Sequence, residues 1–240
     1  YYLFNIICHF ISVPTEKNGK PFDRFRNRLM FPIKDSEGKV IAFGGRAIDK
    51  DAKAKYLNSP ETTLFDKGKS LYNYNVARSE SRKTGSIIVV EGYMDVIALS
   101  QAGYTNVVAP LGTAITETQL DLLWKLSPEP IIALDGDNAG RKANLKVLAE
   151  ALNIPDLEFK VALLPENEDP DSFIRKGGTE KVEALLNKSQ DLLSFCIQSK
   201  IRGASQTSIP SLIRQELLPW LAKLRDPIKQ AFMLQYVAQS

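Results

Sequence analysis

The sequence predicts an α/β protein with a mainly parallel sheet flanked by helices, preceded by a mixed α+β basic segment and followed by a small helical bundle. Apolar runs such as SIIVVEG and PIIALDG, each ending in an acid and a glycine, are typical of buried parallel strands. These runs alternate with helical patterns between residues 86 and 164, as in parallel sheets with helices on both faces. With 240 residues, of which 44% are hydrophobic, the chain can form a substantial core.

The part of the chain before residue 86 predicts antiparallel strands and loops. Leu29, Phe31 and Ile33 stand at alternate positions, a Ser-Glu-Gly turn follows, and residues 40–43 are again apolar. This pattern predicts a β-hairpin that ends at the Gly-Gly pair after residue 43. Turn-forming residues at 58–60 and 67–69 then indicate irregular backbone before a helical stretch that runs to Lys83.

From residue 86 the pattern changes to alternating strand and helix. A helical pattern follows the first strand, with Gly103 as its expected C-terminal cap. Thr116 and Gln119 form a capping-box pattern that opens a second helix. The other expected elements are, in order, the strand NVVAP, the strand PIIALD, the helix AGRKANLKVLAEAL and the strand FKVALL.

After residue 178 the pattern is helical to the end, with breaks expected near Ser205 to Pro210, at Pro219 and at Pro227. We expect these helices to pack on or beside the sheet as a small bundle. The chain is thus divided into a basic segment at 1–83, a sheet domain at 84–180 and a helical segment at 181–240. Because it starts without Met and stops within a helical pattern, we expect it to be a fragment of a longer protein.

The charge is distributed unevenly along a chain whose net charge is +3. Between Lys17 and Lys83 there are 16 Lys and Arg against 8 Asp and Glu, and the remainder has 15 against 20. A basic segment therefore precedes an acidic one. This order indicates an anionic partner for the first and cations for the second, although two solvated faces would give the same counts.

Cysteine and histidine usage excludes several kinds of site. The two cysteines, Cys8 and Cys196, are far apart, and His9 is the sole histidine, so no zinc site can be assembled from this chain. A reducing cytoplasm is the expected location. The apolar opening YYLFNIICHFISV lacks a basic flank and is shorter than the roughly 20 residues that span a bilayer, so we expect no membrane partner.

Acidic residues collect where the predicted strands end. There are six of them: Glu91, Asp95, Asp135, Asp137, Asp169 and Asp171. The carboxyl ends of parallel strands are where open α/β sheets bind ligands, so these side chains are expected to share one cleft. Carboxylates brought that close repel each other unless cations or protons neutralise them. Oxygen ligands of this kind favour Mg²⁺ or Mn²⁺ over zinc.

Clustered acids of this kind also occur in surface turns, in EF-hands and in receiver-type pockets. The sequence DGDN taken alone is common in surface turns. An EF-hand is excluded because the fifth and twelfth positions counted from Asp135 are Ala139 and Lys146. A receiver-type pocket would need a phosphorylatable aspartate and a downstream lysine that we cannot identify. The combination of three acidic strand ends is more specific than any one of them.

The segments VVEGYMDVIAL, LGTAIT and ALDGDNAGRKA resemble a TOPRIM domain, the fold shared by DnaG-type primases, type IA and II topoisomerases and some nucleases. The flanking segments FDRFRNRLMFPIKDSEGKVIAFGGRAI, AKYLNSPETTLFDKGKSLYNYNVA and LPENEDPDSFIRKGG narrow the resemblance to the catalytic core of bacterial DnaG-type primases. It extends from about Lys17 to Gly178 and implies a TOPRIM-type sheet. A topoisomerase is disfavoured because no strand-passage apparatus or recognisable tyrosine nucleophile accompanies the motif.

The resemblance implies a role for each acidic residue. Glu91 matches the TOPRIM glutamate, and Asp135 and Asp137 match its DxD motif, so these three are the expected catalytic metal ligands. Further acids of the same metal site correspond to Asp95, Asp169 and Asp171.

The resemblance also implies a path for template and nucleotide. The family's basic positions along this path correspond to Arg46, Lys55 and Lys67. Three alternating arginines have two possible uses, as an extension of this path or as the solvent-exposed face of a hairpin: Arg24, Arg26 and Arg28. Tyr56 and Tyr72 are candidates for stacking on bases, with core or rim packing as the alternative.

The implied function is a DNA-directed RNA polymerase, or primase. It would make short RNA primers from ribonucleoside triphosphates on a single-stranded DNA template by Mg²⁺- or Mn²⁺-dependent nucleotidyl transfer during bacterial replication. The replicative helicase is the expected partner of the full-length protein, although no helicase-interaction domain is recognisable in this chain. The alternatives are a truncated, non-catalytic remnant that binds nucleic acid or metal, and a TOPRIM phosphodiesterase or nuclease.

Overall fold

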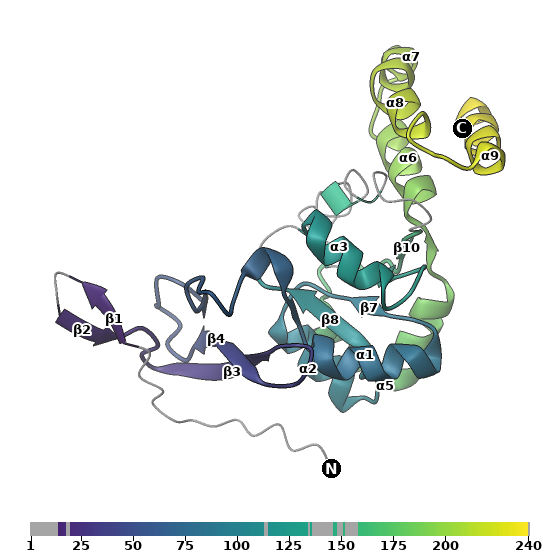
Figure 1. Cartoon of the computed structure of the whole chain (residues 1–240). Helices are drawn as coiled ribbons and strands as arrows, with labels where there is room; N and C mark the ends of the chain where they lie inside the picture. Colours follow the sequence, from purple (N-terminus) through teal and green to yellow (C-terminus); the bar gives the residue numbers. More distant parts are fainter. Residues whose placement is uncertain are drawn as a thin grey trace.

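The computed structural model describes residues 14–17, 20–112, 115–133, 135, 146–147, 151 and 158–239. An antiparallel sheet near the N-terminus lies beside a larger mixed sheet that helices flank, and C-terminal helices project from the far side (Figure 1). Among the described residues, no helix combines the length and apolar character needed to cross a membrane.

The N-terminal strands form two small antiparallel sheets. Their bounds are β1 (Pro14–Lys17) with β2 (Lys20–Asp23), and β3 (Arg28–Lys34), β4 (Val40–Ala47) and β5 (Tyr56–Asn58). The predicted hairpin is confirmed as β3 and β4, but β4 continues through Gly44 and Gly45 instead of ending there. The glycines are needed because a Cβ at Gly44 would lie 2.5 Å from the ring of Tyr93, which packs on this strand.

The central sheet has the order β11-β10-β9-β7-β8-β6. Its strands are β6 (Leu71–Tyr72), β7 (Ile88–Val89), β8 (Val107–Pro110), β9 (Ile131–Ile132), β10 (Lys160–Val161) and β11 (Gln190–Asp191). The four central strands run parallel, and β6 and β11 are antiparallel edges. Val89, Val108 and Ile132 are fully buried, which explains the continuous apolar runs of these strands.

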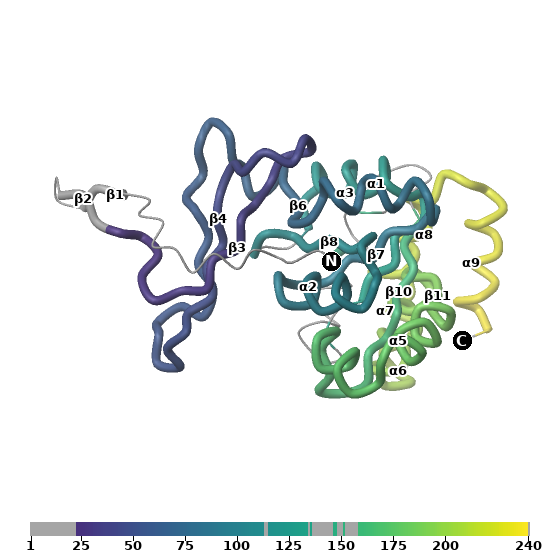
Figure 2. The backbone as a smooth tube through the Cα atoms, turned by 90° about the horizontal axis from the view of Figure 1, so that it is seen from below, coloured from purple at the N-terminus to yellow at the C-terminus, as the bar shows by residue number. Residues whose placement is uncertain are grey.

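Helices cover both faces of the central sheet, as predicted (Figure 2). Their bounds are α1 (Tyr74–Thr84), α2 (Tyr93–Gln101), α3 (Glu117–Trp124), α5 (Pro170–Asn187) and α6 (Leu192–Arg202). Leu120 of α3 joins one hydrophobic cluster, and Val96 of α2 joins the other, together with Ile174 of α5. The expected helix AGRKANLKVLAEAL lies mostly outside the described residues.

Two predicted helix ends are confirmed. Thr116 and Gln119 form the expected capping box, in which Gln119 N donates to Thr116 Oγ1 over 3.2 Å and Thr116 N donates to Gln119 Oε1 over 3.1 Å. Gly103 follows α2 with a φ of +101°, a left-handed conformation that favours glycine.

The expectation of helix from residue 179 as far as the break near Ser205 is wrong at β11, which pairs antiparallel with β10. Asp191 accepts a hydrogen bond from Ser194 N over 2.7 Å and so caps α6. The backbone must therefore leave the helical conformation before Asp191, and the extended residues complete the sheet edge.

The expected break at Pro219 is also wrong. The last elements are α7 (Ile209–Leu212), the π-turn η2 (Ile213–Leu217), α8 (Leu218–Leu221) and α9 (Pro227–Gln239). Helical backbone is continuous from α7 to α8, because the wider π-turn precedes a proline that has no N–H to donate. Pro227 opens α9, a position that suits its fixed φ.

The division at residues 83 and 180 remains a prediction. Two elements connect the proposed segments: β6 comes before residue 83 but pairs with β8, and α5 extends across residue 180. The basic and sheet segments therefore share the central sheet.

Candidate functional site

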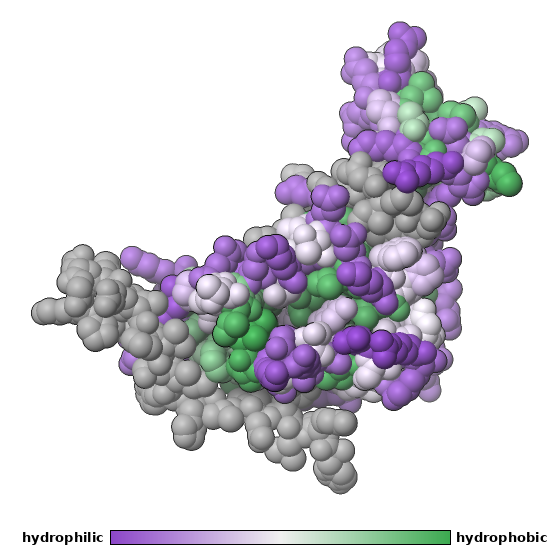
Figure 3. Space-filling model, in the orientation of Figure 1, coloured by the Kyte–Doolittle hydropathy of each residue, from purple (hydrophilic) through white to green (hydrophobic). Residues whose placement is uncertain are grey.

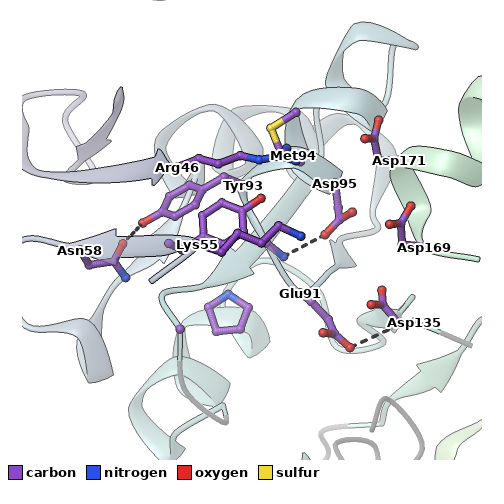
Figure 4. Close-up of a pocket in the computed structure, with 14 residues that line it drawn as sticks. Arg46, Lys55, Asn58, Glu91, Tyr93, Met94, Asp95, Asp135, Asp169 and Asp171 are labelled. Atoms are coloured by element: carbon purple, nitrogen blue, oxygen red, sulfur yellow. Dashed lines mark hydrogen bonds between the residues drawn. The ribbon is translucent and has the colours of Figure 1, made fainter. Parts of the chain in front are cut away.

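A pocket of about 350 Å³ lies where the N-terminal sheet meets the ends of the central strands. One wall is cationic and comes from β4 and β5, with Arg46, Lys55 and Tyr56. The opposite wall is acidic and is formed by Glu91, Asp95, Asp135, Asp169 and Asp171 (Figure 4). Five of the six predicted acids are thus brought together, and Asp137 lies outside the described residues.

Glu91 and Asp135 are held at neighbouring strand ends. Glu91 follows β7 and Asp135 follows β9, and these two strands are adjacent and parallel. The backbone N–H of Asp135 donates to Glu91 Oε1 over 3.4 Å. Since parallel neighbours end at the same sheet edge, the pairing of β7 with β9 brings the two carboxylates together although they are 44 residues apart.

Asp95 occupies the first turn of α2 and is nearly buried, with 9% of its surface exposed. Its carboxylate accepts a hydrogen bond from Gly92 N over 3.0 Å. Burial raises the pKa of Asp95 to about 7, and the negative charges of Asp135 and Asp169 contribute to that rise. Near neutral pH the pocket therefore stabilises either a proton on Asp95 or a cation next to it.

Asp169 and Asp171 enter the pocket from the N-terminus of α5. Asp169 caps this helix, because its Oδ1 accepts a hydrogen bond from Ser172 N over 2.6 Å. Asp171 pairs with Arg175, whose Nε lies 2.7 Å from Asp171 Oδ1. The helix start thus fixes both backbone positions beside the strand ends.

The acidic wall suits a divalent cation by its donor chemistry. Within the part of the chain that the structure describes, no three His, Cys, Asp or Glu residues are placed so that they could hold a metal ion together. Burial, together with the negative charges of Asp135 and Asp169, nevertheless raises the pKa of Asp95, and all the charged donors are hard oxygens. Such a set fits Mg²⁺ or Mn²⁺, ions that accept mixed protein, water and phosphate ligands.

The cationic wall surrounds an aromatic ring. Arg46 Cζ lies 5.8 Å and Lys55 Nζ lies 5.9 Å from the centroid of the Tyr56 ring. Tyr56 is 39% exposed and lines the pocket, whereas Tyr72 is buried and packs edge-on against Tyr93. Of the two tyrosines that are candidates for base stacking, only Tyr56 faces the pocket.

Lys67 is outside this pocket lining. It lies in the short helix η1 (Lys67–Lys69), beside the start of α3, and its carbonyl accepts a hydrogen bond from Gln119 Nε2 over 2.9 Å. The structure therefore brings Arg46 and Lys55 together but leaves Lys67 on a separate surface.

Two of the three alternating arginines support the cationic wall from behind. Arg24 Nε and Nη2 donate to Asn58 O over 3.1 Å and 3.0 Å. Arg28 donates to Gly45 O over 3.1 Å and to Ala54 O over 2.9 Å. Their donors are thus used on backbone carbonyls of this sheet, and Arg26 is exposed.

The pocket residues that sequence reasoning missed include Asn58 and Tyr93. In the sequence Asn58 indicates only a turn, and Tyr93 is only part of a helical pattern. The Tyr93 hydroxyl donates to Asn58 Oδ1 over 2.7 Å. The only hint in the sequence is the Gly44-Gly45 pair within an apolar strand, which is typical of a close approach by another group.

Comparison with known proteins places both halves of the pocket in recognised families. Residues 6–78 match the DNA primase catalytic core, N-terminal domain, and residues 85–162 match the Toprim domain. A DNA primase of Pseudomonas putida is 50% identical over 188 residues, which cover 77% of this chain and 28% of that protein. The chain spans between 28% and 38% of the length of such curated relatives.

Solved structures agree with these matches. The crystal structure of a DNA primase domain from Pseudomonas aeruginosa is 41% identical and has a TM-score of 0.84, covering 95% of this chain and 72% of that chain. A structure of the DnaG primase catalytic domain bound to ssDNA is 36% identical with a TM-score of 0.84, covering 93% of this chain and 72% of that chain.

Proposed function

The chain belongs to the DnaG-type DNA primase family, as part of its catalytic core, and on this basis we propose that it serves to synthesise short RNA primers on single-stranded DNA. The observation that carries the proposal is the contact between Glu91 and Asp135 at adjacent parallel strand ends, opposite a cationic wall. An acidic edge facing cations is the arrangement that metal-dependent phosphoryl transfer requires.

The proposed metal ligands are Glu91, Asp135 and Asp137, with Asp95, Asp169 and Asp171 as further acids of the site. A bound Mg²⁺ or Mn²⁺ would neutralise the triphosphate and acidify the attacking 3′-hydroxyl. The raised pKa of Asp95, about 7, means that the carboxyl retains its proton below neutral pH, and a bound cation would lower this pKa and displace the proton. The protein's own contribution is to hold the carboxylates at fixed strand ends, so that little reorganisation accompanies the reaction.

Arg46 and Lys55 are proposed to bind phosphates of the nucleotide or template from the opposite wall. Lys67 is proposed to contact the nucleic acid outside the pocket, on the surface beside α3. Contacts of this kind depend on charge and not on base identity, so binding would tolerate many sequences and weaken with salt.

The proposed substrates are ribonucleoside triphosphates and a single-stranded DNA template, with the RNA primer as product. The similarity to a primase domain bound to ssDNA supports this choice. The replicative helicase is proposed as a partner of the full-length protein, which would act in the bacterial cytoplasm at replicating DNA.

The test is ribonucleotide incorporation on single-stranded DNA, with and without Mg²⁺, by this chain and by the full-length protein. Replacing Asp135 by Ala should abolish incorporation in the full-length protein without unfolding it. If the Asp135→Ala protein still made primers at the wild-type rate, the proposed site would be wrong. Cleavage of the DNA would instead support a phosphodiesterase.

The short span of the chain relative to its relatives favours one second candidate, a segment that binds nucleic acid and metal without making primers. It predicts Mn²⁺ and single-stranded DNA binding by this chain, together with incorporation only by the full-length protein.

A further inference from the structure

We propose that Asn58 and Tyr93 form a positioning bridge that fixes the cationic wall of the pocket relative to the acidic wall; this inference rests on the proposed function. The two walls come from different sheets, so their separation is not set by strand pairing within either sheet. A polymerase site needs both at once, because phosphates must contact cations and metal ligands in one geometry.

The side-chain amide of Asn58 contacts both parts of the pocket. Asn58 ends β5, next to Tyr56 and Lys55 of the cationic wall. Its Oδ1 accepts the hydrogen bond from Tyr93 at the start of α2, and its Nδ2 donates to Leu111 O, just after β8, over 3.1 Å. One amide therefore links a strand of the N-terminal sheet to two elements of the central domain. Figure 4 shows its bond with Tyr93.

Tyr93 joins the bridge to the acidic wall. It lies two residues after Glu91 and two before Asp95. Its ring stacks on Phe31 of β3, with centroids 4.9 Å apart and planes 7° apart, and meets Tyr72 edge-on at 4.6 Å. Only 7% of Tyr93 is exposed, so the hydroxyl is held at one point in a rigid setting.

The surrounding backbone is shaped for this bridge. Gly44 leaves the space that the Tyr93 ring fills, since any Cβ there would lie 2.5 Å from it. Gly112, which lies beside Asn58 Nδ2, has a φ of +86°, a left-handed conformation that favours glycine. The carbonyl of Asn58 is held in turn by Arg24. Both partners of the bridge are thus fixed by their own neighbours. The bond between them can therefore set the distance between the cationic and acidic walls.

The first experiment is a double-mutant cycle on primer synthesis in the full-length protein. Tyr93→Phe removes only the hydroxyl, and it should lower kcat about tenfold in the wild-type background but less than about twofold when Asn58 is already Ala. The affinity for Mn²⁺ should change less than about twofold, because the bridge does not touch the acids themselves. An equal loss in both backgrounds, or no loss in either, would overturn the proposal.

The matched control is Tyr72→Phe, which removes a hydroxyl from the neighbouring buried ring without touching the bridge. It should keep wild-type kcat. If Tyr72→Phe and Tyr93→Phe lowered kcat equally, the effect would belong to the aromatic cluster and not to the bridge.

The second experiment measures the wall separation without any catalysis. Spin labels would be placed on Asp51→Cys, in the loop between β4 and β5, and on Gln101→Cys, at the end of α2, both exposed positions. In a Cys8→Ser background they would report the distance between the N-terminal sheet's loop and α2. The distance distribution should broaden with Tyr93→Phe and remain narrow with Tyr72→Phe; an unbroadened distribution would overturn the bridge. If the distribution broadened but the protein made no primers, the bridge would be supported and only the proposed function would be contradicted.

Discussion

The two walls of the pocket are built in different ways, and the difference determines which of them can be read from the sequence. The acidic wall stands on adjacent parallel strands of one sheet, and each acid follows its strand or begins the next helix. The cationic wall stands on an antiparallel sheet held in place by side chains from elsewhere, among them Arg24 and Tyr93. The acidic wall thus follows from local patterns, whereas the cationic wall depends on long-range contacts.

The largest effect is expected when an acid of the acidic wall is replaced. We expect Asp135→Ala to lower kcat of primer synthesis by at least about 1,000-fold, because it removes a proposed metal ligand and the transition-state stabilisation that goes with it. Primer synthesis by the full-length protein measures this. Asp51→Asn removes an exposed acid outside the pocket and should stay within about twofold of wild type.

The next effect concerns the pH dependence of the metal-free protein. The folded-state pKa of Asp95 is about 7, above its ordinary value of 3.8, so the native state retains this proton to a higher pH than the unfolded state does. The stabilisation by the Asp95 proton is complete below about pH 4 and is lost as the pH rises through about 7, a loss of roughly 4 kcal/mol. Urea unfolding in EDTA across this range measures it.

The control for this pH dependence is Asp95→Asn, which should flatten the loss because the amide does not titrate. If wild type and Asp95→Asn lost stability in parallel between about pH 4 and pH 7, burial of Asp95 would not be the cause.

A smaller effect tests how closely the two sheets pack. Gly44→Ala places a methyl group 2.5 Å from the Tyr93 ring, so the free energy of unfolding should fall by about 2 kcal/mol. Gly203→Ala, at the end of α6, meets nothing closer than 3.4 Å and should change stability by less than about 0.5 kcal/mol. Urea denaturation of both variants gives the comparison, and equal losses would mean that Tyr93 moves aside without cost.

The smallest effect separates the pocket from the surface beside α3. Lys55→Glu and Lys67→Glu should each reduce the salt dependence of single-stranded DNA binding, by about 0.7 or more in the slope of log K against log salt. Fluorescence anisotropy at several salt concentrations measures this slope. If the slope changed for Lys55→Glu but not for Lys67→Glu, Lys67 would not contact the DNA, and the proposed path would be confined to the pocket.

Local patterns predicted most of the central sheet. The four parallel strands, the capping box at Thr116 and the glycine after α2 follow from side-chain periodicity and backbone preference. The same reasoning failed at β11 and at Pro219, where the partner strand and a π-turn determine the backbone. In both places tertiary context outweighs the local preference.

The sequence by itself determined that Glu91 and Asp135 would share an edge, because parallel strands end together and each of these two acids follows such a strand. Only the tertiary structure decided that Asn58 and Tyr93 connect this edge to the cationic strands, across 35 residues of sequence. The physical reason is that periodicity records a residue's immediate neighbours along an element, whereas a hydrogen bond between two sheets depends on how those sheets pack.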